Sequence, residues 1–333
     1  LIDSAMIPTN AITNAKMADD AIHSVNIAAG AVDSDAIGSS AIPVNKLNIG
    51  QIGGRRNLII NGAMEINQRG ATSGVTSGYF VDRFRLSGCS ASAVITSNTP
   101  TEFPTAITVS ATSGNPIVTQ RIESKNVQHL SGKVVTASFF AKNVSNATTL
   151  YASLQYAGSA DNFGSSTTIT EHNLGSLTSD WVQYTASWTV PAGGLNGLAL
   201  NILCAGSSTF TMGVTGVQLE VGSQATEFEH RSLGDEQNLC WRYYYKTNQG
   251  NHMLKTTSAG ASGDYYWYYY LPIPMRASPT CTVDGGSDNY NHTSSPSIMA
   301  RGSLNMANIN YSKTGTHSQA YFTMDGITAD AEL

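Results

Sequence analysis

Apolar residues recur at every fifth position through Leu1 to Ile52, and this pattern sets the segment apart from the rest of the chain. Residues five apart point to opposite faces of a strand, and on a helix they are rotated by roughly 140°, so neither element gathers them into one stripe. Gly, Pro, Asn, Asp and Ser residues between them supply turns. The apolar positions are Ile2, Ile7, Ile12, Met17, Ile22, Ile27, Val32, Ile37, Ile42 and Leu47.

One ten-residue repeat of this kind is too small to be stable alone. Burying its two aliphatic side chains contributes roughly 3–6 kcal/mol, whereas ordering the backbone of ten residues costs roughly 10–20 kcal/mol. The remainder must come from backbone ladders and from packing against other copies. We therefore expect residues 1–56, including a Gly53–Arg56 linker, to form a multi-chain shaft whose apolar positions make the oligomer contacts. A disordered linker is the alternative.

From Asn57 the spacing of apolar residues falls to two, which predicts strands. Clusters of Gly, Ser, Asn and Pro separate the apolar runs, and no stretch has the pattern of a clear amphipathic helix. The sequence thus predicts an antiparallel β-sandwich over residues 57–232. The predicted strands include Lys133–Lys142, Trp181–Pro191, Leu198–Cys204 and Val217–Val221.

A third segment begins at Leu233. Asp235–Tyr245 predicts a short helix that leads into a strand, with Ser232 and Asp235 as a capping box. The aromatic stretch Asp264–Thr280 adds further strand signal. We therefore expect an all-β chain with a fibrous shaft (1–56), a β-sandwich (57–232) and a second β-rich domain (233–333).

The amino-acid composition restricts the classes of molecule that the protein is expected to bind. Only 12% of the 333 residues are charged, about half the usual share, so the surface must be made of Ser, Thr, Asn, Gly and Tyr, as is common in extracellular and virion β-proteins. The net charge of −5 is spread evenly, without the basic stripe that nucleic acid binding needs. No apolar run approaches the roughly 18 residues of a membrane span, and no signal peptide is visible. We expect neither nucleic acid binding nor membrane insertion.

The four cysteines are far apart in the sequence. Cys89, Cys204, Cys240 and Cys281 form no CxxC motif and no Cys/His pair at metal-binding spacing. Buried free thiols are the favoured interpretation, and a Cys240–Cys281 disulfide is the alternative. The sequence predicts no metal site and no cofactor.

Four motifs of the middle segment carry a family resemblance: Asn57–Gly70 (NLIINGAMEINQRG), Tyr79–Leu86 (YFVDRFRL), Trp181–Pro191 and Val217–Ser232. In this order they resemble the jelly-roll, carbohydrate-binding-module-like domain of bacteriophage tail fibres. Related calcium-bearing modules often carry an acidic NGDFE-like start and a paired Asp near the last strand. Here Ala63 replaces the first Asp, leaving Glu65, and Thr215 and Gly216 stand near the place of the pair, so we expect no calcium.

The C-terminal segment resembles the last domain of many phage tail fibre proteins. It has a Pro-x-x-Met-Arg-x-x-Pro-Thr-like strand, here Pro272 or Pro274, Met275, Arg276, Pro279 and Thr280, and it ends in DAEL, Asp330–Leu333. Ten-residue repeats upstream are also common in such fibres. The chain starts at Leu1 rather than Met, which predicts a preceding segment that could carry an anchor.

The resemblance implies a homotrimeric tail fibre, exposed on the virion to the extracellular medium, with shaft, sandwich and receptor-binding tip in that order. Its partners would be other virion tail proteins, reached through the preceding segment, and a host surface polysaccharide or outer-membrane receptor. The implied function is adhesion to host glycan. Alternatives are a glycan-degrading tailspike-type enzyme, a binding module of a secreted glycosidase, and a sandwich that serves only as a spacer.

Glycan cleavage would need two carboxylates about 5–10 Å apart. The densest acidic group is Glu220, Glu227 and Glu229, beside His230 and Arg231. Glu227 and Glu229 would share a face of an extended strand, but a solvated edge at a domain exit is the favoured interpretation. Histidines form no HExxH motif, and no Ser lies in a GxSxG motif. The sequence therefore predicts a protein that is not an enzyme.

The aromatic run is the strongest binding signal. On a strand it splits, with Tyr266, Tyr268 and Tyr270 on one face and Tyr265, Trp267 and Tyr269 on the other. These rings suit stacking on sugars; the alternative is a core face and an inter-chain face. The polar loops Asn248–Met253 and Gly285–His292 are further candidates, with ordinary solvated turns as the alternative. The candidate residues are Tyr265, Tyr266, Trp267, Tyr268, Tyr269, Tyr270, Asp288, Asn289, Tyr290 and His292.

Overall fold

The computed structural model describes residues 27, 56–247, 252–256, 263–284, 289–290, 297–299, 305–313 and 320–333. The chain divides into two compact units, Leu1–Asn48 and Ile49–Leu333. In the first unit the described residue is Ile27, which is 44% exposed. The other nine apolar positions of the repeat lie outside the described residues, so the shaft and its trimeric assembly stay predictions.

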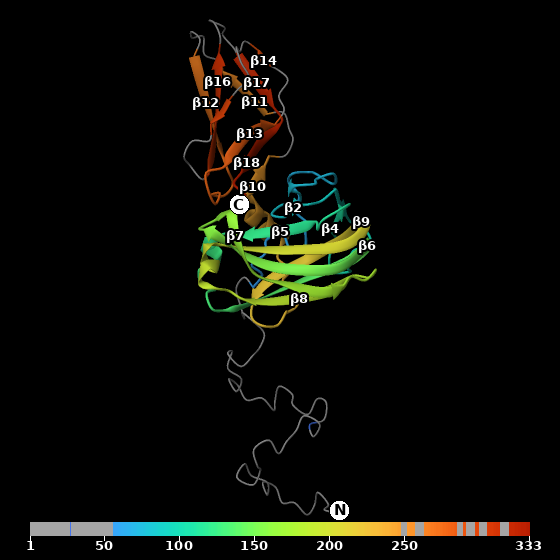
Figure 1. Ribbon diagram of the computed structural model, residues 1–333. Coiled ribbons are helices and arrows are strands. Elements are labelled where there is room, and N and C mark those ends of the chain that lie inside the picture. The colour runs from blue at the N-terminus through green and yellow to red at the C-terminus, as the bar shows by residue number, and fades with distance from the viewer. Residues whose placement is uncertain are drawn as a thin grey trace, which may run out of the picture. The chain divides into compact units, whose positions relative to one another are not determined.

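The segment from Gly78 to Val221 forms an antiparallel β-sandwich, which confirms the predicted all-β fold (Figure 1). Its nine strands are hydrogen-bonded into one continuous sheet that curls over itself. The strands are β1 (Gly78–Tyr79), β2 (Arg85–Ser87), β3 (Ala91–Ile95), β4 (Ala106–Ala111), β5 (Ile117–Ile122), β6 (Val134–Ser159), β7 (Asn162–Ser176), β8 (Val182–Thr189) and β9 (Leu198–Val221). A short helix, α1 (Ser124–Val127), and a 3-10 turn, Ala192–Asn196, complete the sandwich.

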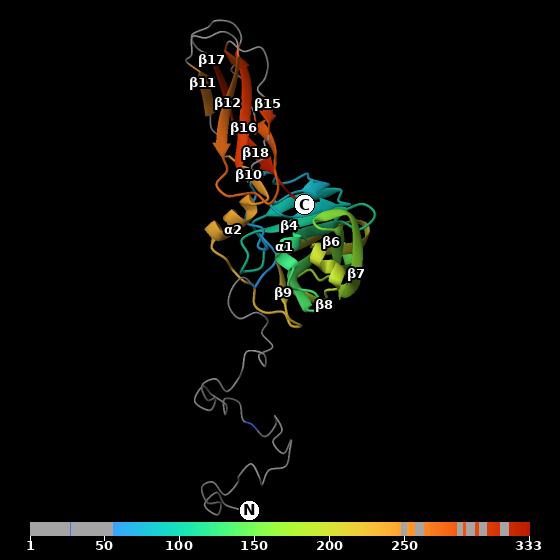
Figure 2. The ribbon, with the colours of Figure 1, turned by 90° about the vertical axis from the view of Figure 1, so that its left-hand side faces the viewer.

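Two long strands, β6 and β9, belong to both layers of the sandwich (Figures 1 and 2). The first half of β6 pairs with β8 and with the second half of β9. Its second half pairs with β7 and with the first half of β9. β5 and β2 extend the layer that contains Leu198–Leu203, whereas β4 and β3 extend the layer that contains Phe210–Val214.

The hydrophobic core lies between these two layers, as the period of two predicts. Ala137 and Phe139 of β6 and Leu200 and Ile202 of β9 belong to one buried cluster, although each pair comes from a different layer. On β8, Trp188 is also buried, whereas Val182, at the other end of the same strand face, is 38% exposed. Two facing layers thus share one core, which is why the sandwich needs both.

A β-bulge separates the two halves of the pairing between β6 and β9. Thr215 lies opposite Phe140, but Gln218 lies opposite Ser138, so β9 has one extra residue here. Gly216 has a φ of 61°, and a Cβ at this position would lie 2.6 Å from the ring of Phe103. An aromatic ring therefore packs at the position where the sequence resemblance would place the Asp pair of a calcium-bearing module. Among the described residues, no group of three His, Cys, Asp or Glu side chains could hold a metal ion.

The described residues of the range 233–333 form a helix and three small antiparallel sheets, ordered β10-β18-β13, β11-β17-β14 and β12-β16-β15. The helix, α2 (Leu233–Trp241), begins at Ser232, whose hydroxyl accepts a hydrogen bond from the amide of Asp235 at 3.2 Å. This confirms the predicted helix and its cap. The strands are β10 (Tyr244–Lys246), β11 (His252–Thr256), β12 (Gly263–Tyr270), β13 (Thr280–Asp284), β14 (Asn289–Tyr290), β15 (Ser297–Met299), β16 (Met306–Lys313), β17 (Ala320–Met324) and β18 (Gly326–Asp330).

The structure corrects the predictions of two loops and one strand. His252 and Met253 belong to β11, and Asn289 and Tyr290 form β14; both strands pair with β17, which overrides the local turn signals. The predicted Pro-x-x-Met-Arg-x-x-Pro-Thr strand is instead an irregular connection between β12 and β13. Its prolines lack the N–H that a ladder requires.

The last residues of the chain pack against the sandwich. The carboxylate of Glu332 pairs with the fully buried guanidinium of Arg83, whose Cζ lies 3.5 Å from the centroid of the Tyr243 ring. The hydroxyl of Tyr79 donates to the backbone oxygen of Leu333 at 2.8 Å. Arg276 of the irregular connection donates to the carbonyl oxygen of Ala331 at 2.6 Å. The motif DAEL thus helps to join residues 233–333 to the sandwich.

All four cysteines are free thiols, so the alternative Cys240–Cys281 disulfide is wrong. Cys204 and Cys240 are buried, as expected, whereas Cys89 and Cys281 are half-buried. Burial raises the pKa of Cys89 to about 11 and that of Cys204 to about 12. At neutral pH these thiols are protonated, and they act as small apolar side chains.

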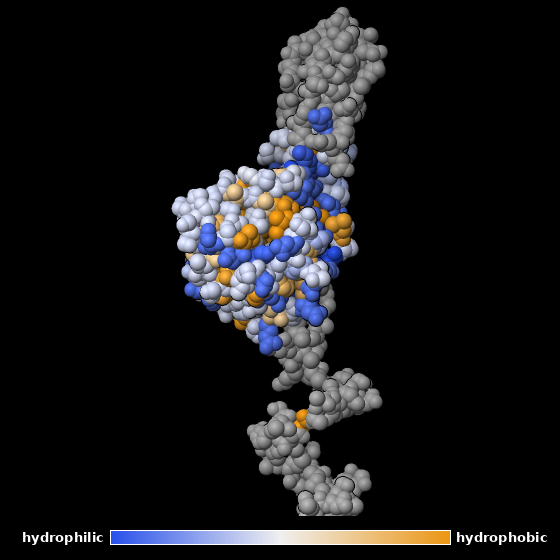
Figure 3. All heavy atoms as spheres, turned by 90° about the vertical axis from the view of Figure 1, so that its right-hand side faces the viewer, coloured by the Kyte–Doolittle hydropathy of each residue, from blue (hydrophilic) through white to orange (hydrophobic). Residues whose placement is uncertain are grey.

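The surface of the sandwich agrees with the low charge content. Most of the face shown in Figure 3 is pale, the colour of Ser, Thr and Gly, with scattered strongly hydrophilic and apolar residues. In the described part of the chain no helix is both long and apolar enough to cross a membrane.

Candidate functional site

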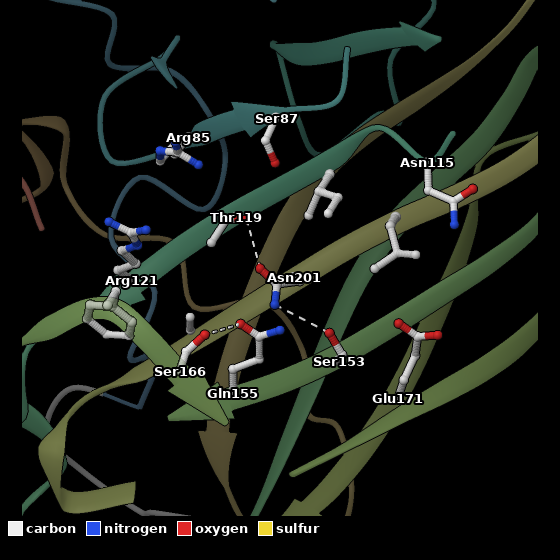
Figure 4. A pocket seen from close by; sticks show the side chains of 14 residues that line it. Arg85, Ser87, Asn115, Thr119, Arg121, Ser153, Gln155, Ser166, Glu171 and Asn201 are labelled. Atoms are coloured by element: carbon white, nitrogen blue, oxygen red, sulfur yellow. Dashed lines mark hydrogen bonds between the residues drawn. The ribbon is translucent and has the colours of Figure 1, made fainter. Parts of the chain in front are cut away.

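A groove lies on the outward face of the layer that contains β2, β5, β7 and the paired segments of β6 and β9 (Figure 4). The cavity has a volume of about 350 Å³, within the range of small-molecule sites. Its lining residues are Arg85, Ser87, Asn115, Ile117, Thr119, Arg121, Ser153, Gln155, Phe163, Ser166, Glu171, Ala199, Asn201 and Leu203.

Strand alternation puts these side chains into the groove. On β9, Leu200 and Ile202 point into the core, so their neighbour Asn201 points outward. On β6, Leu154 lies in the core and Gln155 lines the groove. The groove is therefore built on strands that the hydrophobic core fixes from behind.

A hydrogen-bond network holds the floor of the groove. The hydroxyl of Thr119 donates to Oδ1 of Asn201 at 2.8 Å, and Nδ2 of Asn201 donates to Oγ of Ser153 at 3.3 Å. Beside it, Oγ of Ser166 donates to Oε1 of Gln155 at 3.2 Å. These bonds fix the orientation of two amides, so that their remaining donors and acceptors are preorganised for a ligand.

Charge is distributed unequally along the groove. Arg85 and Arg121 lie together near one end, and Glu171 lies far from them (Figure 4). The Cζ of Arg121 lies 5.0 Å from the centroid of the Phe163 ring, a cation–π contact. Burial lowers the pKa of Arg121, and the neighbouring charge of Arg85 acts in the same direction, although Tyr79 opposes it.

The groove can thus offer guanidinium, hydroxyl and amide groups to a polar ligand, together with one half-buried aromatic ring. Sugar hydroxyls are both donors and acceptors, and pyranose rings have apolar faces, so this combination suits a saccharide. Among the described residues that line the groove, Glu171 is the one carboxylate. A two-carboxylate hydrolysis needs a second.

The predicted aromatic residues lie elsewhere, on β12. Tyr268 and Tyr270 are 54% and 71% exposed, whereas Tyr269 is half-buried and shares a hydrogen bond of 2.8 Å between hydroxyls with Tyr245. The predicted alternation of faces is confirmed for these three residues. Burial raises the pKa of Tyr245, and the bond to Tyr269 adds to the effect. Tyr269 thus has a packing role.

The structure describes no side chain of the remaining candidate residues. Tyr265, Tyr266 and Trp267 lie on β12, and Asn289 and Tyr290 lie on β14, with backbones alone described. Asp288 and His292 lie outside the described residues. Of the candidate side chains that the structure describes, Tyr268, Tyr269 and Tyr270 do not line the groove.

The predicted acidic group is a structural clamp. The carboxylate of Glu229 accepts hydrogen bonds from the amides of Asn57 at 2.7 Å and Arg56 at 3.2 Å, and it pairs with Arg231 at 3.2 Å. Burial opposes ionisation, but these bonds prevail and lower the pKa of Glu229. We call these four residues the entry–exit clamp, because they join the segments that enter and leave the sandwich.

Glu220 is fully buried, and its carboxylate accepts hydrogen bonds from the amide and the hydroxyl of Thr226 at 2.8 and 2.7 Å. The interpretation of this group as a solvated edge is therefore wrong for Glu220 and incomplete for Glu229, whereas Glu227 is exposed. The physical reason is that backbone amides compete with water for both carboxylates.

Sequence reasoning missed the groove. One signal was available: in Leu198–Cys204 the positions between the core residues hold Ala199, Asn201 and Leu203, which are more apolar than a solvated face usually is. These residues are buried, because other groove side chains cover this face. The pattern indicates a covered outer face, but it does not name the residues of other strands that cover it.

Comparison with known proteins gives a set of fold likenesses. The sequence matches no protein-family model and no curated protein sequence. Among solved structures, the enzymatically active domain of tailspike protein 4 of bacteriophage CBA120 has 17% identity and a TM-score of 0.34, and the match covers 50% of this chain and 21% of that chain. The carbohydrate-binding module TmCBM61, in complex with β-1,4-galactotriose, has 14% identity and a TM-score of 0.33, with 50% and 99% covered.

The xylan-binding domain CBM22-1 of Paenibacillus barcinonensis Xyn10C has 13% identity and a TM-score of 0.34, with 52% of this chain and 100% of that chain covered. What the groove of this chain can bind follows from its own side chains.

Proposed function

We propose that this chain is an adhesive segment of a bacteriophage tail fibre, and that its groove binds a glycan of the host surface. The observation that carries the proposal is the fixed polar floor of the groove, in which Asn201 and Gln155 are oriented by hydrogen bonds on strands anchored in the core. Binding sites built on strands hold their geometry better than sites on loops.

The side chains support binding rather than cleavage. The lining supplies one carboxylate, Glu171, and that carboxylate is exposed. A catalytic acid needs a raised pKa and a second carboxylate within about 5–10 Å. The described side chains of the groove offer no such pair.

The proposed assembly is a homotrimer, with residues 1–56 as shaft, 57–232 as glycan-binding sandwich and 233–333 as tip. Three weak sites on one fibre, and several fibres on one particle, would convert modest affinities into firm attachment by avidity. The proposed partners are other virion tail proteins and the host surface polysaccharide or outer-membrane receptor.

The groove is tested by binding of the full chain to purified host surface polysaccharide, measured by calorimetry. Gln155→Ala removes an oriented amide, and we expect affinity to fall by about 5- to 30-fold. Thr185→Ala, an exposed position on β8, is the control. Unchanged affinity of the Gln155 variant would contradict the assignment. Chain length of the polysaccharide is followed in the same samples, since an adhesin leaves it constant and a depolymerase shortens it.

A second candidate contact is the exposed face of β12. Tyr268 and Tyr270 lie two residues apart on one strand face, and both present more than half of their surface to solvent. We expect Tyr268→Ser/Tyr270→Ser to reduce adsorption of the fibre to host cells while glycan binding by the groove is retained. Normal adsorption would restrict recognition to the sandwich.

A further inference from the structure

Arg85 and Arg121 differ from the other arginines in the described segments of the chain. Each of the other six arginines in the described segments forms an ion pair with an Asp or Glu side chain. Neither Arg85 nor Arg121 has such a partner among the described residues. The six paired arginines are Arg56, Arg69, Arg83, Arg231, Arg242 and Arg276.

The guanidiniums of Arg85 and Arg121 share one end of the groove, and neither pairs with a described Asp or Glu side chain (Figure 4). Arg85 of β2 lies opposite Thr119 of β5, and Arg121 is two residues further along β5 on the same face. Diagonal neighbours of this kind are roughly 7–8 Å apart between strands, within reach for long side chains. Nη1 of Arg121 donates to an oxygen of Leu333, and the guanidinium of Arg85 makes no hydrogen bond with a described residue.

This arrangement is unfavourable without an anion. Two like charges face each other in a partly desolvated groove, and Glu171 lies too far along the groove to pair with either in Figure 4. A guanidinium offers a planar fork of donors that matches a carboxylate or phosphate with two parallel hydrogen bonds. A bound anion would therefore both neutralise the repulsion and satisfy the free donors.

We propose that the groove selects an anionic saccharide, whose carboxylate or phosphate group binds at Arg85 and Arg121 while its hydroxyls contact the floor at Asn201 and Gln155. This inference rests on the proposed function and adds the substrate class. Neutral saccharides would bind to the polar floor of the groove but leave Arg85 without a counter-charge.

The test uses the full chain and three polymers: polygalacturonate, which carries carboxylates, a glycerol-phosphate teichoic acid, which carries phosphates, and neutral galactan. We expect at least tenfold tighter binding to one of the two acidic polymers than to galactan at low salt, and weaker binding as salt rises. Arg85→Gln should remove about tenfold or more of that affinity. The acidic polymer that binds identifies the preferred group.

Lys133→Gln is the matched control, because Lys133 is exposed, the change in net charge is the same, and the residue precedes the half of β6 that lies in the other layer. Arg85 has no internal partner, so its replacement should leave the thermal unfolding temperature unchanged, which the same samples verify.

The possible outcomes separate the two proposals. Equal binding of acidic and neutral polymers, no binding to either acidic polymer, or equal loss in the Arg85 and Lys133 variants would overturn the anionic selectivity. Glycan binding as such is judged independently by the host polysaccharide and the Gln155→Ala variant.

Discussion

Asp82 shows how one buried residue links stability to pH. It is fully buried and accepts a hydrogen bond from the amide of Gln68 at 3.0 Å, while Arg69 lies 3.6 Å away. Burial raises its pKa to about 6, although Gln68 and Arg69 act in the opposite direction. In the unfolded chain the same carboxyl titrates near 3.8. The folded state therefore binds this proton more tightly than the unfolded state.

The sign follows from proton linkage. As pH falls from above 6 to below 4, Asp82 adds to the free energy of unfolding, by about 2–3 kcal/mol. We expect Asp82→Asn to remove this gain, so that the difference between variant and wild type changes across that window. Urea denaturation at several pH values measures it.

Asp180→Asn, at an exposed position, is the control for this prediction. Parallel stability profiles for wild type and Asp82→Asn would show that Asp82 keeps an ordinary pKa.

For single residues, the sequence predicts packing in the hydrophobic core better than it predicts contacts with a ligand. Val135, Ala137, Phe139 and Ala141 alternate along the predicted strand Lys133–Lys142, a spacing that places them on one face, and all four are buried. Arg85 could not be assigned, because its role depends on which strand lies beside β2. Strand order is set by long-range pairing, which periodicity does not encode.

At the bulge in β9, both backbone conformation and packing restrict which residue can be accommodated. Gly216 combines a φ of 61° with a neighbouring ring 2.6 Å from the position of a Cβ. We expect Gly216→Ala to lower the free energy of unfolding by about 2–4 kcal/mol, since both backbone strain and displacement of Phe103 contribute.

Gly114→Ala separates these two contributions. Gly114 has a φ of 72° but has no other atom within 4 Å of its Cβ position, so only the backbone cost of about 1–2 kcal/mol applies. Equal losses for the two variants in urea denaturation would mean that Phe103 moves aside without cost.

The strands themselves were largely predictable, but their lengths were not. Asn143 and Asn146, in the middle of β6, are residues that often form turns between strands. Asn146 has a φ of 51°, as turn residues often do. The strand nevertheless continues through these residues, because the bend carries it from one layer to the other. Local turn chemistry therefore marks a bend here, and the partner strand decides whether pairing resumes.

For the molecule as a whole, the pair of Glu332 and Arg83 joins distant parts of the chain. Arg83 is 1% exposed, and its partner comes from the last residues of the sequence. We expect Glu332→Gln to lower the free energy of unfolding by about 3–5 kcal/mol, because it leaves a buried guanidinium without a counter-charge. Thermal unfolding measures the loss.

Glu65→Gln is the matched control, because Glu65 is exposed. A second variant, Arg83→Met/Glu332→Leu, should recover part of the loss, since it removes both charges. If the Glu332→Gln variant were as stable as the control, the ion pair between Glu332 and Arg83 would not contribute to the stability of the protein.

The repeat yields a prediction about copy number. Deletion of residues 1–55 should convert an oligomer into a monomer, because the repeat can be stable only by packing against other copies. Light scattering on the truncated protein measures this. An unchanged oligomer would assign the assembly to residues 233–333 instead.

The entry–exit clamp also has a mechanical consequence. Tension applied between residue 56 and residue 233 meets the bonds of Glu229 to Asn57 and Arg56 before it reaches any strand of the sandwich. For a load carried by residues 233–333, the force path therefore bypasses the groove, and a glycan bound in the groove does not bear that load. Single-molecule pulling should show one early rupture at the clamp, lost in Glu229→Ala, followed by unfolding of the sandwich at a higher force.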